Sequence, residues 1–257
     1  MHLFDPALPF ASSSVLKHGR ASVDDYRGLQ CRLRLERCVL VQPSSYGLDH
    51  RVLLAGLKAM GDSARGVAVV DPSFTRADLG ALNAQGVVGA RFNLVQAGAT
   101  HVDMLEPVAN AVAEFGWHLQ LHAHPERLIE LAPRLQALPL PVVIDHLARL
   151  NVTPALRRDV VAVVRSLVAN GKTWLKLSAP YIASPGSHDY ADLDELVQCL
   201  ANGHIDRLVW GSDWPHVTEA LKPDDAALMN LLARWFGAEQ REQILVHNAT
   251  SLYSFDR

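Results

Sequence analysis

The chain has 257 residues, of which 49% are hydrophobic and 20% charged, and a formal net charge of −3 at pH 7. This length suits one domain with a large core, at the size of a single (β/α) barrel, and we expect that domain to span residues 1–257. The mildly acidic balance, without any long basic run, argues against a nucleic-acid partner and favours a small-molecule substrate. No stretch approaches the roughly 18 unbroken apolar residues of a membrane span, so we expect no membrane partner.

Short apolar runs bounded by Gly, Pro and Asp alternate with longer amphipathic segments along the whole chain. The opening residues 1–4 resemble the tail of a strand, and we expect the true start of that strand to lie upstream. The other predicted strands are residues 38–41, 66–70, 87–94, 117–123, 141–144, 173–178 and 207–210. Predicted helices follow them: one from Ser22 as N-cap, then 49–60, 76–84, 102–115, one from Pro125, 154–169 and 189–201.

Each predicted strand is followed by a helix, which calls for a parallel sheet covered on both faces. Seven strands and the stump predict an α/β fold, a (β/α)8 TIM barrel whose strand one is truncated at the N-terminus. A doubly wound open sheet is the alternative, but no GxGxxG or Walker loop follows the first strands.

Polar residues end most of these strands, and the carboxyl ends of barrel strands meet at one mouth. They are His2; Gln42 and Ser44; Arg91 and Asn93; His118, Gln120 and His122; His146; Ser178; and Asp213. His118, Gln120 and His122 share one face of their strand at period two, and a buried strand has no structural need for that. We therefore expect a functional role for the set His2, His122, His146 and Asp213.

Asp213 follows the apolar run 207–210 and is surrounded by the strand breakers Gly211, Ser212 and Pro215. A breaker at this point places the carboxylate at the carboxyl end of a strand. By itself the segment allows a second interpretation, in which Asp213 caps the next helix or fills a turn. The other strand ends decide in favour of the site.

The series of motifs resembles the amidohydrolase-2 family, closest to the branch of 2-pyrone-4,6-dicarboxylate lactonase and its relatives. The motifs run through nearly the whole chain, from MHLFDP through HLQLH and IDH to the specific WGSDWPH. The resemblance implies a (β/α)8 barrel and hydrolysis at its carboxyl-terminal mouth. It matches Asp213 to the aspartate of strand eight, His146 to the histidine of strand six and His2 to the second histidine of an HxH pair.

Three positions depart from that family pattern. The first histidine of the HxH pair lies beyond the start of this chain, Ala97 stands where dicarboxylate lactonases have a second arginine, and Ile182 follows Ala-Pro-Tyr where relatives often have arginine. Guanidinium groups are the usual bidentate partners of carboxylates. We therefore expect a substrate that is less anionic than a pyrone dicarboxylate.

The chemistry implied is the opening of a small carboxylate-bearing lactone without a metal or other cofactor. Asp213 acts as the general base toward water, and His146, His2 and Arg91 polarise the carbonyl oxygen. The remaining pocket residues expected to contact the substrate are Arg91, Gln42, Ser44, Tyr46, His122, Tyr181 and His216.

Two other functions remain open at this point. Histidine and aspartate from different strands are ligands of zinc or manganese, so His2, His122, His146 and Asp213 allow a divalent-metal amidohydrolase or decarboxylase. Against it, Arg91 stands where a metal site calls for an anionic ligand. The third possibility is a non-catalytic binding barrel.

Cys31, Cys38 and Cys199 are odd in number and form no CxxC pair. Such a pattern indicates reduced thiols and neither a disulfide framework nor a structural zinc site. Since the opening residues also lack the pattern of an export signal, we expect a cytoplasmic protein. The sequence does not indicate an oligomeric state.

Overall fold

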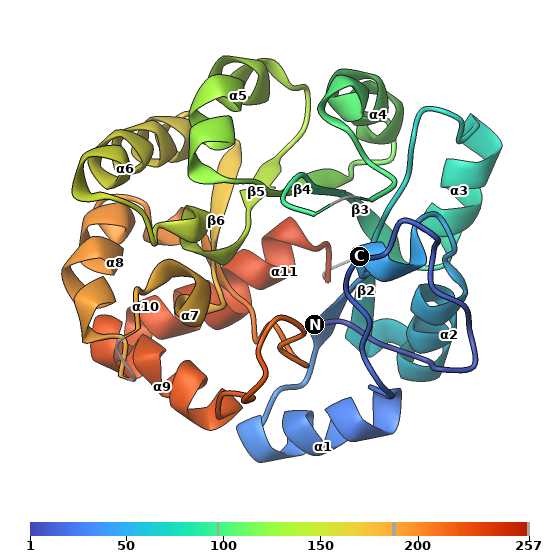
Figure 1. Ribbon diagram of the computed structural model, residues 1–257, viewed down its shortest axis with the longest axis horizontal. Coiled ribbons are helices and arrows are strands. Elements are labelled where there is room, and N and C mark those ends of the chain that lie inside the picture. The colour runs from blue at the N-terminus through green and yellow to red at the C-terminus, as the bar shows by residue number, and fades with distance from the viewer. Residues whose placement is uncertain (97, 187–188, 256–257) are drawn as a thin grey trace.

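The computed structural model describes residues 1–96, 98–186 and 189–255. Within these ranges, seven strands pair in parallel in the order β1 to β7, each with its neighbour in sequence. Their bounds are β1 Cys38–Val41, β2 Ala64–Ala68, β3 Val87–Asn93, β4 His118–His122, β5 Val142–Ile144, β6 Thr173–Leu177 and β7 Leu208–Trp210. The sheet curls on itself inside a surrounding ring of helices (Figure 1).

Most helices lie on the outer face of this sheet, and α11 lies near its middle in the same view (Figure 1). The helices are α1 Val23–Leu33, α2 Arg51–Met60, α3 Arg76–Ala84, α4 Leu105–Ala113, α5 Pro125–Ala137, α6 Pro154–Ala169, α7 Pro180–Ala183, α8 Asp194–Ala201, α9 Asp225–Trp235, α10 Ala238–Glu242 and α11 Asn248–Leu252. None of the helices in the described ranges is long and apolar enough to cross a lipid bilayer.

Helix starts follow local signals in the sequence. Ser22 caps α1, accepting a hydrogen bond from the Asp25 amide, while the Asp25 carboxylate bonds back to the Ser22 amide. This reciprocal capping box satisfies two amide groups that the first helical turn leaves unpaired. Thr153 caps α6 ahead of Pro154, whose missing N–H costs nothing at the first helical position. The predicted strand 38–41 and the predicted helices 76–84 and 154–169 match the structure at both ends.

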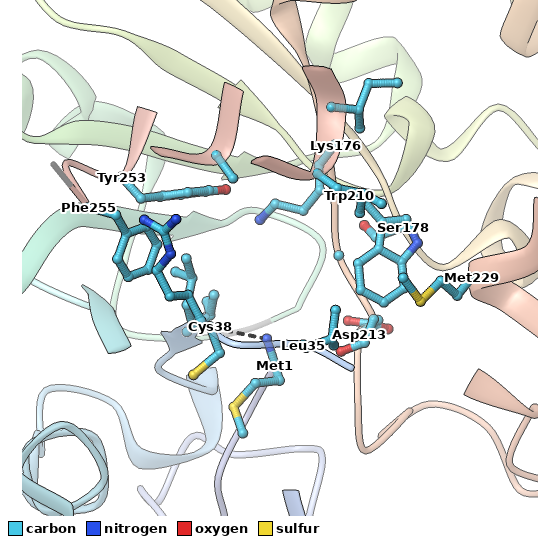
Figure 2. Close-up of a pocket in the computed structure, with 18 of the residues that line it drawn as sticks. Met1, Leu35, Cys38, Lys176, Ser178, Trp210, Asp213, Met229, Tyr253 and Phe255 are labelled. Atoms are coloured by element: carbon cyan, nitrogen blue, oxygen red, sulfur yellow. Dashed lines mark hydrogen bonds between the residues drawn. The ribbon is translucent and has the colours of Figure 1, made fainter. Parts of the chain in front are cut away.

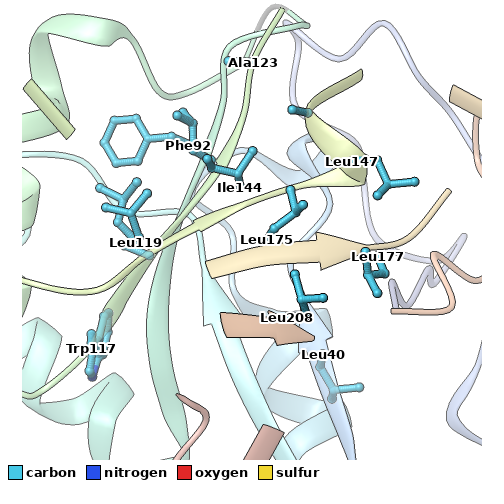
Figure 3. Packing of buried hydrophobic residues seen from close by; sticks show 14 of the residues in the cluster. Leu40, Phe92, Trp117, Leu119, Ala123, Ile144, Leu147, Leu175, Leu177 and Leu208 are labelled. Carbon is cyan, nitrogen blue, oxygen red and sulfur yellow. The ribbon is translucent and has the colours of Figure 1, made fainter. Parts of the chain in front are cut away.

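The strands bury both faces, as expected for a sheet covered by helices. In β4, Leu119 and Leu121 pack into the main hydrophobic cluster, together with Leu175 of β6 and Ile144 of β5 (Figure 3). The alternate residues of β4 are also buried although they are polar, because they face the interior of the curled sheet. The predicted separation of an apolar and a polar face in this strand is confirmed.

The amino-terminal end of the sheet interior is closed by a second apolar cluster. Val143, Trp174 and Val209 from three strands pack against Leu252 and Tyr253 at the end of the chain. Side chains from the strands and from residues 252–253 therefore meet at this end of the sheet.

His118 lies at this closed end, far along β4 from His122, with its ring 5.2 Å from that of Tyr253. Gly89 of β3 is its neighbour, and a Cβ atom on Gly89 would lie 2.4 Å from Cε1 of His118. Glycine is thus required where the imidazole fills the interior. His118 belongs to the packing and does not reach the mouth.

The opening residues take a different form from the strand expected for them. Met1 and His2 belong to no strand among the described residues, and Phe4 makes an isolated antiparallel bridge with Ala21. The Met1 carbonyl accepts from the Val41 amide at 2.9 Å, and the His2 amide donates to the Trp214 carbonyl at 2.8 Å. These two residues therefore connect β1 with the segment after β7. In the described part of the chain the sheet has seven strands, and this short piece joins its two edges.

Candidate active site

Segments that follow the strands surround a small cavity of about 50 Å³. The residues that line it include His2, Ser44, Arg91, Asn93, His122, His146 and Asp213. They come from the opening residues, β3, β4 and the segments after β1, β5 and β7. The structure thus brings together six of the predicted site residues, and with them Asn93.

Asp213 stands in a tight turn after β7, and its two carboxylate oxygens have different surroundings. Its backbone is left-handed, with φ of 57°, and its carbonyl accepts from the His216 amide at 2.8 Å. The Tyr181 hydroxyl donates to Oδ2 at 2.6 Å, and Oδ1 lies 3.8 Å from Nε2 of His146. Burial favours a higher pKa for Asp213, but His146, His2 and the phenol hydrogen bond outweigh it and hold the pKa below its usual value. Asp213 is therefore ionised at neutral pH.

His146 follows β5 and begins a short run of left-handed residues. Its Nδ1 lies 2.9 Å from Oγ of Ser178, and its ring meets that of His122 edge to face at 4.7 Å. Burial lowers the pKa of His146, against the opposing effect of Asp213. A neutral ring that accepts from Ser178 at Nδ1 carries its proton on Nε2, where it faces Asp213.

His2 is held beside Asp213 by its other ring nitrogen. Nδ1 lies 2.7 Å from the Val41 carbonyl, which can only accept, so Nδ1 carries the proton. Burial and the nearby Arg91 lower the pKa of His2 to about 3. At neutral pH its Nε2 is therefore a free acceptor.

Arg91 of β3 supplies a buried positive charge. One terminal nitrogen donates to the Gln42 carbonyl at 2.8 Å, while its Nε has no hydrogen-bond partner among the described residues. Close by, the Asn93 amide donates to the Ser44 hydroxyl at 3.0 Å. Arg91 forms no ion pair within the described part of the chain, so part of its hydrogen-bonding capacity is available to a ligand.

Arg149 is a second cation at this mouth, and sequence reasoning missed it. Its guanidinium donates to Nε2 of His122 at 3.1 Å, and burial lowers its pKa. No carboxylate in the described ranges forms an ion pair with it. Its place in the sequence could have identified it, since Arg149 stands three residues after His146 in the same segment.

Three predicted contact residues support the site from behind. The Gln42 amide donates to the Gly47 carbonyl at 2.7 Å, and its oxygen accepts from the Val69 amide at 2.9 Å. The Tyr46 hydroxyl donates to the Asp5 carbonyl at 3.0 Å. These two side chains hold the loops over the mouth.

His216 is the third of these predicted contact residues. It lies behind Tyr181, and Tyr181 adjoins Asp213. Its Nδ1 is 3.0 Å from the Tyr181 hydroxyl and its Nε2 is 3.0 Å from Oδ1 of Asp225. His216 is only 2% exposed and does not line the small cavity.

A larger cavity of about 400 Å³ borders His2, Arg91, His146 and Asp213 from the other side. It runs along the edge between β1 and β7, where Met1, Lys176 and Asp213 gather around one space (Figure 2). Cavities of this volume are typical of small-molecule sites.

Beneath the mouth, a buried ion pair spans the sheet interior. Lys176 Nζ lies 2.8 Å from Oδ1 of Asp145, and Gln120 donates to Oδ2 at 2.9 Å. The pair fixes the segment that carries His146.

The four residues of the alternative metal site, His2, His122, His146 and Asp213, lie among positively charged groups. Within residues 1–96, 98–186 and 189–255, no group of three or more His, Cys, Asp or Glu side chains is placed to hold a metal ion. Nε2 of His122 faces the Arg149 guanidinium, and the Arg91 cation is nearby, so the donor set meets positive charge. Ala97, the position of a missing arginine, lies outside the described residues.

Comparisons with known proteins identify the family of the chain. The sequence profile of the amidohydrolase family matches residues 1–255. A 2-pyrone-4,6-dicarboxylate hydrolase from Comamonas testosteroni is 32% identical over 98% of this chain and 88% of its own. A D-galactarolactone isomerase from Agrobacterium fabrum is 31% identical over 98% and 89%.

A solved structure is also similar. It is a probable 2-pyrone-4,6-dicarboxylic acid hydrolase from Acinetobacter baumannii with citric acid bound, 28% identical, with a TM-score of 0.86 over 98% of this chain and 97% of that one. Because the family profile and two relatives above 30% identity span nearly all of the sequence, the chain belongs to the amidohydrolase family.

Proposed function

We propose that the protein hydrolyses a small lactone bearing at least one carboxylate, with water activated by Asp213 and without a metal. The observation that carries this proposal is the convergence of an ionised carboxylate, three neutral imidazoles and a buried guanidinium on one cavity. The relative named a 2-pyrone-4,6-dicarboxylate hydrolase supports the general reaction, which is hydrolysis of a cyclic carboxylic ester.

Asp213 is the general base in this proposal. Tyr181 holds Oδ2, which leaves Oδ1 to take a proton from water as the water oxygen bonds to the lactone carbonyl carbon. The resulting tetrahedral oxyanion collapses by breaking the bond to the ring oxygen, which receives the proton that Asp213 holds. General-base catalysis of this kind is typically worth 10²–10⁴-fold in rate.

The oxyanion is stabilised by donors that stand ready before the reaction. The Nε2–H of His146 and the free N–H groups of Arg91 are donors of this kind that line the cavity. Neutral His2 offers an acceptor and not a donor, so its role is to hold the water by accepting its second proton in a hydrogen bond. Removing one preorganised donor typically costs about 2.7–4 kcal/mol of barrier.

Recognition of the substrate carboxylate is assigned to Arg91 and Arg149. Arg91 is buried and Arg149 is half-buried, neither forms an ion pair in the described ranges, and guanidinium groups bind carboxylates through paired hydrogen bonds. From the missing arginines we expected a substrate less anionic than a pyrone dicarboxylate. Arg149 changes that expectation, because it adds a second cation to Arg91 at the mouth. A dicarboxylate therefore fits the charge of the site as well as a monocarboxylate does. Ser44, Asn93 and His122 contribute the remaining polar contacts.

We further propose that the curled sheet is a (β/α)8 barrel in which residues 1–2 take the place of the first strand. Their hydrogen bonds to β1 and to the segment after β7 support this, as does the likeness to the Acinetobacter structure. The free cysteines support a reducing, cytoplasmic compartment.

The test is a panel of three lactones: 2-pyrone-4,6-dicarboxylate, a muconolactone with one carboxylate, and uncharged δ-valerolactone. Hydrolysis forms one new carboxylic acid and so releases one titratable proton at pH 7, whereas isomerisation releases none. We expect proton release with the charged lactones, at least 100-fold faster in kcat/KM than with the uncharged one. Isomerisation without proton release, or preference for δ-valerolactone, contradicts the proposal.

Chelator treatment tests the metal-independent part separately. We expect activity to survive dialysis against EDTA, and a loss of activity that zinc or manganese restores contradicts this part of the proposal.

The general base is tested with the variant Asp213→Asn. Asp62→Asn serves as its matched control, because Asp62 is an exposed carboxylate at the other end of the sheet.

A further inference from the structure

A line of three hydrogen-bonded side chains leads from Asp213 away from the cavity into the protein. Tyr181 bonds to Oδ2 of Asp213 at 2.6 Å and to Nδ1 of His216 at 3.0 Å, and Nε2 of His216 meets Oδ1 of Asp225 at 3.0 Å. His216 is 2% exposed and Asp225 is 7% exposed. No lactone-binding role explains an imidazole and a carboxylate buried at this depth.

The number of protons available in this line limits how its hydrogen bonds can be arranged. The phenol of Tyr181 has one proton, yet its oxygen meets two groups, the Asp213 carboxylate and Nδ1 of His216. If Nδ1 carries no proton, it competes with Asp213 for the phenol proton. If Nδ1 carries a proton, it donates to the phenol oxygen and leaves the phenol free to donate to Asp213.

Asp225 decides between these two arrangements. Its carboxylate can only accept at Nε2, so Nε2 of His216 carries a proton. With both ring nitrogens protonated, all three contacts are satisfied at once and the positive ring lies between two carboxylates, Asp213 beyond Tyr181 and Asp225 directly. Charge-assisted hydrogen bonds of this kind are about twice as strong as neutral ones.

Local structure holds this line in place from both ends. Asp225 is the first residue of α9, and His216 ends the turn that begins at Asp213, with a left-handed φ of 56°. Tyr181 lies in the short helix α7 after β6. Three separate elements therefore converge on one row of donors and acceptors.

Other charged and titratable groups face the line without interrupting it. They are Arg32 of α1, 3.7 Å from Oδ2 of Asp225, with Tyr26 on the same helix; Lys222, whose Nζ donates to the His216 carbonyl at 2.8 Å; and Glu219 and Tyr190 near Tyr181. Arg32 pairs with the carboxylate oxygen that His216 does not use. It therefore leaves Oδ1 of Asp225 to the imidazole.

We propose that His216 and Asp225 are positioning residues that force the Tyr181 phenol to donate to Oδ2 of Asp213, so that Oδ1 becomes the basic oxygen. They touch neither water nor substrate and act through Tyr181. The kinetic part of this inference rests on the proposed hydrolysis. The protonation state of His216 does not, and it is measurable in the protein alone.

The first experiment reads the imidazole directly by ¹⁵N NMR of histidine-labelled protein, with the His216 signals assigned by their loss in His216→Gln. We expect both ring nitrogens of His216 to carry protons at pH 7 in the wild type, and one only in Asp225→Asn. A neutral His216 in the wild type overturns the inference, whatever the enzyme hydrolyses.

The second experiment is a double-mutant cycle on whichever lactone is turned over. Asp225→Asn is expected to lower kcat about 10–100-fold with little change in KM, as orienting partners behind an active group typically do. Since Asp213 loses a donor, its pKa rises and the acid limb of kcat/KM moves to higher pH. In the Tyr181→Phe background, the same substitution is expected to have no further effect.

Asp224→Asn is the matched control for Asp225→Asn. Asp224 also lies within 3.5 Å of Arg32, but its side chain caps α9 through the Ala226 amide and does not contact His216. Asparagine preserves such a cap. Equal losses in the two variants, or additive effects in the cycle, mean that Asp225 serves only the stability of α9 and overturn the positioning role.

Discussion

The Arg149 guanidinium donates to Nε2 of His122 at 3.1 Å, and this contact sets the character of one side of the mouth. Because a guanidinium can only donate, Nε2 of His122 must accept and the ring is neutral. Burial likewise lowers the pKa of His122 well below its usual value. His122 thus accepts a hydrogen bond from a cation and also lines the cavity.

The anion-binding role assigned to Arg149 predicts a specific kinetic signature. Arg149→Met is expected to raise KM for a carboxylate-bearing lactone about 10–100-fold with a smaller change in kcat, since a hydrogen bond to a charged group is worth about 1.5–3 kcal/mol. Arg149→Lys keeps the charge but loses the paired hydrogen-bond geometry, so its KM should lie between those of the wild type and Arg149→Met. Steady-state kinetics with charged and uncharged lactones are the measurement.

Arg158→Met is a suitable control for this prediction because Arg158 is an exposed arginine of α6. An equal rise in KM for the uncharged lactone would show that Arg149 shapes the pocket and does not bind the carboxylate.

The pH dependence of hydrolysis follows from the pKa values of the site. Asp213 is active when ionised, and its pKa lies below the ordinary 3.8, so activity is present above that pKa and is lost as pH falls through it. The pKa of His2 is about 3, and burial lowers the pKa of His146 below the ordinary 6.5, so we expect neither residue to produce a limb at pH 6.5 in kcat/KM. A pH-jump assay that limits exposure to acid checks this.

Asp213→Asn is expected to lower kcat by about 10²–10⁴-fold over the same pH range, which is the usual contribution of a general base. Retention of full activity by this variant would disprove the base assignment.

The buried pair of Lys176 and Asp145 is expected to control stability more than chemistry. Burial lowers the pKa of Lys176 and raises that of Asp145, but their mutual attraction reverses both shifts. Lys176→Met leaves a carboxylate buried without its ammonium partner and should cost about 3–5 kcal/mol of unfolding free energy. Urea unfolding at pH 7 measures it.

Adding Asp145→Asn to Lys176→Met removes the unpaired charge and should restore part of that stability. A double variant no more stable than Lys176→Met would show that side-chain packing, and not charge, accounts for the loss.

His118 is expected to make the fold sensitive to acid. Burial and the nearby Lys176 lower its pKa to about 3, against 6.5 for an ordinary histidine. Between these two pH values the unfolded chain binds a proton that the folded protein does not, so stability falls as pH falls, by at most about 1.4 kcal/mol per unit from this residue. Urea unfolding midpoints at pH 7, 5 and 4 give the dependence of stability on pH.

His118→Gln should show a shallower loss of stability on acidification, whatever its stability at pH 7. The exposed His101→Gln should leave the slope unchanged. Equal slopes in the wild type and His118→Gln would contradict the prediction.

The alternation of strands and helices was predictable because it depends on local signals. Ser22 and Asp25 form their capping box within four residues, and the strand 38–41 is an apolar run between breakers. The positions of His146 and Asp213 at strand ends were equally readable, because a parallel strand has one direction and its breaker marks its carboxyl end.

By itself, then, the sequence determined the α/β layout, the amphipathic faces and the candidates at the strand ends, since each depends on residues close together in the chain. Only the tertiary structure decided the partners. The contacts of Arg149 with His122, of Asp225 with His216 and of Lys176 with Asp145 join residues 27, 9 and 31 positions apart. Hydrogen-bond geometry and desolvation depend on angstrom-scale distances in the folded chain, and no periodicity in a single sequence encodes them.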